Sequence, residues 1–96
     1  MNPDRTITVS VQVLPLMPDA IPIVDRAIEV IQKSGIRHMV TPHETVMEGT
    51  LDACMATARA AHEVCLEAGA NKVVTFIKIV DSTEGSYIDA KLEKYR

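Results

Sequence analysis

The amino-acid sequence predicts an α+β domain in which a four-stranded antiparallel sheet carries two helices on one face. Apolar and polar residues alternate near both ends of the chain, at residues 6–14 and 72–80, as in strands with one buried face. Two stretches of helical periodicity lie between them, separated by a hairpin that a proline marks. Two β-α-β units with right-handed crossovers form a ferredoxin-like β-α-β-β-α-β sandwich. The 96 residues are expected to make one such domain, residues 1–96.

The first strand and the first helix follow from the pattern of residues 6–35. Four apolar residues, at positions 7, 9, 11 and 13, point to one side of the strand, and polar residues alternate with them. Asp19 is expected to cap the helix, and Pro22 falls within its first turn, where a missing backbone donor costs little. Gly35 then supplies a left-handed stop.

The hairpin is expected to send its side chains to both faces of the sheet. Thr50 follows it as the cap of a second helix, which keeps helical spacing from Leu51 to Leu66. A fourth strand covers residues 72–80, and a short C-terminal helix is expected over about residues 86–95. The hairpin residues expected to face the helices are Ile36, His38, Val40, Thr45 and Met47.

The sheet face without helices, called the open face below, has a mixed composition. It is too apolar for water and too polar for a closed core. Burying a polar group there without a partner costs about 1–3 kcal/mol. We therefore expect the sheet to associate with that of another subunit, face to face or edge to edge, in a dimer or tetramer with polar pockets at the seam. The residues assigned to the open face are Thr8, Ser10, Gln12, Arg37, Met39, Thr41, Val46, Glu48, Val74, Phe76, Lys78 and Val80.

Composition excludes several classes of protein. A net charge of −3, with no basic run, argues against a nucleic-acid or anionic-membrane surface. The N-terminus has no apolar signal region and no apolar run reaches transmembrane length, so a cytoplasmic location is expected. Cys54 and Cys65 lie about 16 Å apart along one predicted helix, too far for a disulfide. They are interpreted as small buried apolar residues.

The sequence contains no residue set typical of catalysis. The four glycines are scattered and form no phosphate loop, and no Ser or Cys nucleophile adjoins a base on an exposed surface. The three histidines lack metal-ligand spacing. No catalytic residue, metal or cofactor is therefore expected.

Polar residues on the first strand and in the hairpin turn are candidates for ligand binding. Ser10 and Gln12 offer fixed donors and acceptors on a rigid strand, which suits a neutral heteroaromatic ligand. The same two residues also fit ordinary polar alternation on a half-exposed strand. His43 lies at the turn, where it is expected to be exposed and available to a ligand.

Two further residues of the open face have alternative interpretations. Glu48 is placed to accept hydrogen bonds from an aminopyrimidine, or to form an ion pair with Lys78. Phe76, the only phenylalanine, is placed to stack on a ligand ring or to pack against the next subunit.

Several segments together resemble the MTH1187/YkoF-like family of small thiamine-binding proteins. The segments are Thr8-Val9-Ser10-Val11-Gln12-Val13-Leu14-Pro15, Gly35-Ile36, Thr41-Pro42-x-x-Thr45-Val46-Met47-Glu48-Gly49 and the ending Asp89-Ala90-Lys91-Leu92-Glu93-Lys94-Tyr95-Arg96.

The resemblance implies a ferredoxin-like fold, dimers that pair into a homotetramer, and binding of thiamine or its hydroxymethylpyrimidine moiety without established catalysis. His43 and Glu44 occupy the variable places between Pro42 and Thr45, where ligand preference could differ. The polar positions of the family fall here on Ser10, Gln12, Thr41, Thr45 and Glu48.

The function expected from the sequence is therefore small-molecule binding at a subunit interface, with thiamine or hydroxymethylpyrimidine as the ligand. One alternative is a regulatory or structural assembly module without a ligand. Another is an enzyme acting on a thiamine precursor with Glu48 as acid–base, although no nucleophile, metal set or cofactor loop supports it.

Overall fold

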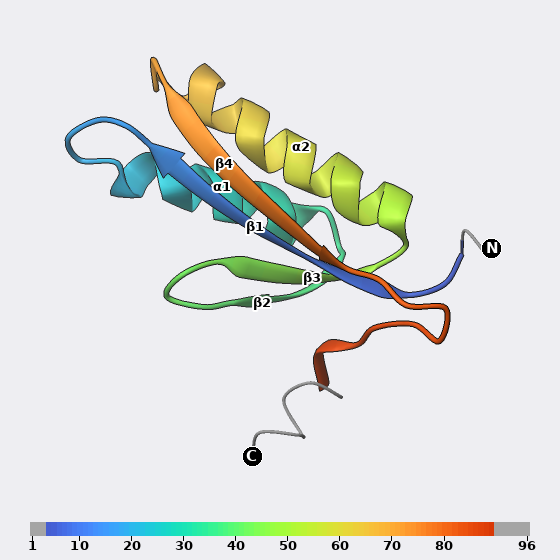
Figure 1. Cartoon of the computed structure of the whole chain (residues 1–96). Coiled ribbons are helices and arrows are strands. Elements are labelled where there is room, and N and C mark those ends of the chain that lie inside the picture. The colour runs from blue at the N-terminus through green and yellow to red at the C-terminus, as the bar shows by residue number, and fades with distance from the viewer. Residues whose placement is uncertain (1–3, 90–96) are drawn as a thin grey trace.

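The elements of the protein follow the order that the sequence predicts (Figure 1). A computed structural model describes residues 4–89. The sheet has the strand order β2-β3-β1-β4, every neighbouring pair is antiparallel, and both helices lie on one face. The predicted ferredoxin-like sandwich is confirmed. The elements are β1 (Ile7–Pro15), α1 (Ile21–Lys33), β2 (Arg37–Val40), β3 (Thr45–Gly49), α2 (Leu51–Glu67) and β4 (Val73–Val80).

β1 lies between β3 and β4 and sets which side chains face the helices. Its pairing with β3 ends where Val11 lies opposite Thr45, whereas its pairing with β4 continues to Pro15. Directly opposed residues share a face of a sheet. The expected division of β2 and β3 side chains between the two faces is therefore confirmed. A second consequence is that Gln12–Pro15 pairs with β4 alone.

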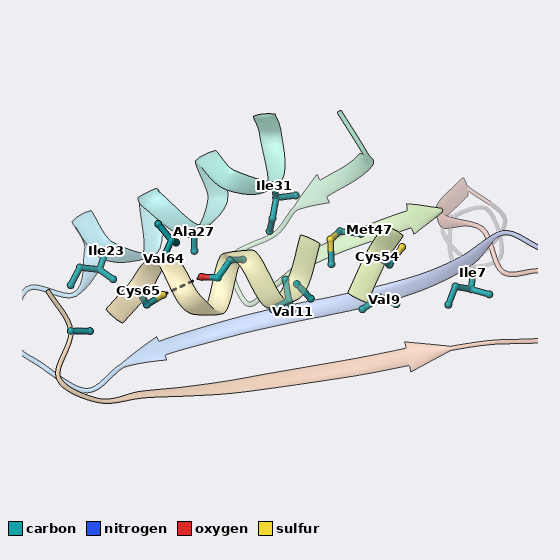
Figure 2. Close-up of a cluster of buried hydrophobic side chains, with 13 residues drawn as sticks. Ile7, Val9, Val11, Ile23, Ala27, Ile31, Met47, Cys54, Val64 and Cys65 are labelled. Carbon is teal, nitrogen blue, oxygen red and sulfur yellow. Dashed lines mark hydrogen bonds between the residues drawn. The ribbon is translucent and has the colours of Figure 1, made fainter. Parts of the chain in front are cut away.

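The core between the sheet and the helices is built from aliphatic, small and sulfur-containing side chains (Figure 2). Alanines at the helix contacts let α1 and α2 lie close to β1, and each fully buried larger side chain contributes about 1.5–3 kcal/mol. Both cysteines are free and buried, as predicted. The buried core residues are Ile7, Val9, Val11, Ile23, Ala27, Ile31, Met47, Cys54, Ala58, Ala61, Val64, Cys65 and Ala70.

The two helices begin differently. Thr50 caps α2 as predicted, because its hydroxyl accepts a hydrogen bond from the backbone N–H of Ala53 at 3.2 Å. The predicted cap of α1 is wrong. Ala20 holds the N-cap position in a helical conformation without a side-chain bond, and Asp19 adopts a φ of +57°, whereas a capping side chain needs an extended backbone at that position. Pro22 lies in the first turn, as expected.

The chain after β4 turns back beneath the sheet, on the side away from the helices (Figure 1). Gly85 allows this turn with a φ of +91°, and a Cβ atom there would lie 2.9 Å from the ring of Tyr87. Helical conformation begins at Ile88. The rest of the C-terminal helix predicted over residues 86–95 lies outside the described residues.

Candidate functional site

The predicted ligand residues fall into two groups. One group lines a cavity beside the β2–β3 turn, called the hairpin cavity below, and consists of Gln12, Thr41, His43 and Thr45. The other group, Ser10, Glu48 and Phe76, lies on the open face outside this cavity. Gln12, which pairs with Phe76, belongs to the open face as well and reaches the cavity from there.

The hairpin cavity has an apolar wall and a polar rim. Its volume is about 80 Å³, which exceeds the ~10–15 Å³ that one water needs and falls below the ~300 Å³ of sites for drug-sized ligands. The cavity therefore has room for a single small ring rather than for a larger ligand. The lining residues are Val11, Gln12, Val13, Val24, Ala27, Ile28, Ile31, Val40, Thr41, Pro42, His43, Glu44, Thr45 and Ala61.

Thr41 holds the turn that forms one side of this cavity. Its hydroxyl donates to the carbonyl oxygen of Glu44 at 2.7 Å and accepts from the backbone N–H of Glu44 at 3.0 Å. The backbone N–H of His43 donates to the same hydroxyl at 3.3 Å. Thr41 therefore shapes the turn, and it leaves the His43 side chain exposed at the rim.

The backbone of β1 supplies a feature that side-chain patterns do not show. Because β3 ends opposite Val11, β1 has no neighbouring strand on that side along Gln12–Pro15. Alternate residues of a strand direct both N–H and C=O to the same side. Backbone donors and acceptors of β1 are thus left beside the cavity. The one sign of this unpaired stretch in the sequence is that the β1 pattern is longer than the β3 pattern. β3 is the shorter strand because the hairpin turn places its first residue at Thr45.

Ser10 lies in the middle of the open face and is buried within the single chain, at 8% exposure. It sits between Val46 and Lys78 of the neighbouring strands. The Lys78 ammonium forms an ion pair with the Glu44 carboxylate at 2.8 Å. Because β4 and Glu44 lie on opposite sides of β1, this pair crosses the open face beside Ser10 and Gln12.

Glu48 is engaged by its own chain through both carboxylate oxygens. One oxygen accepts from the Arg37 guanidinium at 3.0 Å, and the other accepts from the backbone N–H of Ile88 at 3.0 Å. The side chain is only 9% exposed. The alternative of a Glu48–Lys78 ion pair is wrong, because Lys78 pairs with Glu44 instead.

Further contacts hold the segment after β4, residues 82–89, against the open face. The Ser86 and Thr8 hydroxyls are hydrogen-bonded at 3.0 Å in a buried position, and the Ser86 N–H donates to the Thr6 carbonyl at 2.8 Å. Arg37 donates to Asp89 at 2.7 Å, and this bond is the main cause that raises the pKa of Arg37. The segment therefore closes the Thr8 end of the open face.

The opposite end of the open face is apolar and uncovered in the described chain. Phe76, which lies opposite Gln12, is 52% exposed. Leu14 and Val74, which lie opposite each other at this end, are exposed too. This surface agrees with both interpretations of Phe76, stacking on a ring and packing against a subunit.

The two cysteines and the potential metal ligands were considered as sources of reactivity. Burial raises the pKa of both cysteine thiols, and the Glu48 carboxylate adds to the effect at Cys54. Both thiols therefore stay protonated at neutral pH, which makes them poor nucleophiles. Within residues 4–89, no three His, Cys, Asp or Glu side chains are grouped to hold a metal ion. No helix in this part of the chain is long and apolar enough to cross a bilayer.

Similar proteins of known structure share this fold over nearly their whole length. A domain of unknown function from Bacillus cereus is 40% identical with a TM-score of 0.91, covering 100% of this chain and 96% of that one. A candidate thiamine biosynthesis/salvage protein from Thermotoga maritima is 32% identical with a TM-score of 0.84, covering 95% of this chain and 99% of that one.

Sequence relatives point the same way. The UPF0045 protein CPE1503 of Clostridium perfringens is 38% identical over 93 residues, which are 95% of this chain and 98% of the relative. A family described as thiamine-binding protein matches residues 9–96. The resemblance seen in the sequence is thereby confirmed, and the chain belongs to the thiamine-binding protein family.

Proposed function

We propose that this protein binds thiamine or its hydroxymethylpyrimidine moiety, with the pyrimidine ring in the hairpin cavity. The observation that carries the proposal is the meeting of Gln12 of β1 with Thr41, His43 and Thr45 of the β2–β3 hairpin around one cavity with an apolar wall. A methylated aminopyrimidine has apolar faces and an edge of donors and acceptors. The apolar wall suits the faces of the ring, and the polar side chains together with the β1 backbone beyond the end of β3 suit its edge.

The small volume of the cavity bears on where the rest of the ligand lies. A space of about 80 Å³ holds one ring, so the remainder of a thiamine molecule extends outside. We propose that a second copy of the chain, packed on the open face, covers that remainder. The uncovered Phe76 end of this face supports such packing, and the resulting assembly is a homodimer or homotetramer that binds without chemical conversion.

Calorimetry with thiamine and with hydroxymethylpyrimidine tests the proposal. At a protein concentration of about 0.1 mM, the heat of binding reports even weak complexes. Thr45→Val keeps the shape of the buried side chain and removes its hydroxyl. It is expected to weaken binding about tenfold, since a lost hydrogen bond costs about 1–1.5 kcal/mol. Thr57→Val is the control, because the Thr57 hydroxyl bonds within α2. The absence of heat for both ligands would refute the proposal.

A second candidate function is an assembly module without a ligand, and the exposed Leu14, Val74 and Phe76 favour it. It predicts a stable oligomer that gives no heat with either compound. An enzyme that uses Glu48 as acid–base is a weaker candidate, because Arg37 and Ile88 engage both carboxylate oxygens. Turnover of a thiamine precursor that Glu48→Gln abolishes, while the precursor still binds, would favour the enzyme.

A further inference from the structure

One ion pair lies at the mouth of the hairpin cavity. The Lys78 ammonium and the Glu44 carboxylate are 2.8 Å apart, and Glu44 is also one of the residues that line the cavity. Lys78 lies on β4 opposite Ser10 of β1, whereas Glu44 directly precedes β3 on the other side of β1. The lysine side chain therefore reaches across β1 to a carboxylate that belongs to the cavity.

The two members of this ion pair are not held equally firmly. The Glu44 side chain is 23% exposed, and the Lys78 side chain is 66% exposed. The backbone N–H and C=O of Glu44 are both hydrogen-bonded to the Thr41 hydroxyl, at 3.0 Å and 2.7 Å. A lysine ammonium, in contrast, is strongly hydrated and sits on a flexible aliphatic stem. The carboxylate is thus the fixed member of the pair, and the ammonium is the member that can leave.

The surroundings of the Glu44 carboxylate suit a flat organic cation. Gln12 of β1 lines the same cavity, and Phe76 lies opposite Gln12 on β4. Phe76 is 52% exposed on the open face, which is the face that the Glu44–Lys78 pair crosses. An aromatic ring attracts cations, and a carboxylate attracts them more strongly. The mouth of the cavity therefore presents a negative charge close to a strand that carries an exposed ring.

We propose that the Glu44–Lys78 ion pair makes the site select its ligand by charge. A permanently cationic group, linked to the ring in the hairpin cavity, takes the place of the Lys78 ammonium at Glu44. This inference rests on the proposed function and deepens it. In thiamine the cationic group is the thiazolium, for which a cavity of about 80 Å³ has no room, so it lies at the mouth. Hydroxymethylpyrimidine has no such group and leaves the ion pair intact.

Lys78 acts in this scheme as an internal competitor of the ligand. Because one cation replaces another, the partly buried Glu44 carboxylate is never left without a partner, which would be costly. The released ammonium returns to water. Thiamine binding is weakened by as much as the Glu44–Lys78 pair is worth, and a pair between partly exposed groups corresponds to at most about a fivefold change in an equilibrium constant. Lys78 therefore sets the preference of the site between cationic and neutral ligands.

The ratio of the thiamine and hydroxymethylpyrimidine dissociation constants, measured by calorimetry on the full chain, tests the proposal. Lys78→Met removes the competing cation and is expected to shift the ratio in favour of thiamine by about twofold to fivefold. In a Glu44→Gln background the same substitution should not shift the ratio, because the carboxylate is already gone. Lys33→Met is the matched control, since Lys33 pairs with Glu29 on the surface of α1. A ratio that Lys78→Met leaves unchanged, or shifts equally in both backgrounds, would overturn the proposal.

A second measurement does not depend on affinity. Nuclear magnetic resonance of the lysine ammonium groups follows how fast the Lys78 ammonium protons exchange with water, which is slow while the ammonium is paired. Saturation with thiamine is expected to speed this exchange to the rate in Glu44→Gln, and saturation with hydroxymethylpyrimidine is expected to leave the rate unchanged. If the protein binds both compounds and the two rates are equal, the proposed function stands and this inference is overturned. If it binds neither compound, the proposed function itself fails.

Discussion

The two ends of β1 carry similar polar residues but differ in what surrounds them. Thr8 is 3% exposed and hydrogen-bonded to Ser86, with Glu48 on the neighbouring strand tied to Ile88. Gln12 lies four residues further along β1 and is half-buried at the rim of the hairpin cavity. At this point β1 has passed the last residue that pairs with β3. The first end is closed by contacts within the chain, and the second is left open to other molecules.

This difference shows how residues with the same alternation take different roles. A polar residue at the closed end stabilises the fold because the chain itself supplies its partner. We propose that a polar residue at the open end keeps its hydrogen-bonding groups for a ligand or another subunit. The comparison predicts that substitutions at the closed end change stability, whereas substitutions at the open end change binding.

Substitution of Glu48 should give the largest effect on stability. Glu48→Ala leaves the Ile88 N–H and the Arg37 guanidinium without their shared acceptor, and we expect a loss of about 2–3 kcal/mol in the free energy of unfolding. Glu48→Gln keeps one acceptor oxygen and should lose about half as much. Urea unfolding measures both, and hydrogen exchange at Ile88 should speed up in parallel.

The control for Glu48 lies at the open end of the sheet. Glu44→Gln removes the ion pair with Lys78, whose side chain is 66% exposed. Such a pair is worth about 0–1 kcal/mol, so this variant should remain close to the wild-type stability. If Glu44→Gln cost as much as Glu48→Ala, the distinction between the two ends would be wrong.

A pair of substitutions on β1 itself should give the next largest effect. Thr8→Val removes the buried hydrogen bond to Ser86 and should cost about 1 kcal/mol of stability, with thiamine binding unchanged. Gln12→Leu should leave the unfolding midpoint nearly unchanged and weaken binding about tenfold. Thermal unfolding and calorimetry on the same samples measure both quantities. A loss of binding in Thr8→Val together with a loss of stability in Gln12→Leu would contradict the roles assigned to the two ends.

The smallest effect is expected from pH at the closed end. The hydrogen bond from Arg5 lowers the pKa of Asp81 below its ordinary value of 3.8. A carboxylate with a lowered folded-state pKa stabilises the fold above the unfolded-state pKa, and this contribution is lost as the pH falls through the folded-state value. The wild type and Asp81→Asn should therefore differ in Tm near neutral pH and converge below pH 3.8. A difference that persists in acid would contradict this origin.

Much of the fold could be predicted from local patterns. Period-two alternation assigned β1 and β4 to their positions and placed Thr45 and Met47 toward the helices, as the register confirms. Thr50 was recognisable as a cap because its partner, Ala53, is only three residues away. The prediction of Asp19 as the cap of α1 is wrong because Asp19 adopts a positive φ in the turn before Pro22. Residue type alone does not specify this local conformation.

The candidate site was predictable only in part. Gln12, Thr41, His43 and Thr45 do meet at one cavity, but Ser10 and Glu48 lie elsewhere. The sequence pattern presents Glu48 as a ligand acceptor or as a partner of Lys78, and it does not predict the contacts with Arg37 and Ile88. Ile88 is 40 residues away in the chain, so no spacing rule could connect them.

The sequence by itself determined the order of the strands and helices, the two faces of the sheet and the aliphatic core, because these depend on periodicities of two and 3.6 residues. The tertiary structure alone decided that β1 extends past β3 beside a cavity and that the chain after β4 returns across the open face. It also decided that Glu48 pairs with Arg37 and that Glu44 pairs with Lys78. These features depend on where distant segments come together in space, and that is set by packing rather than by local pattern.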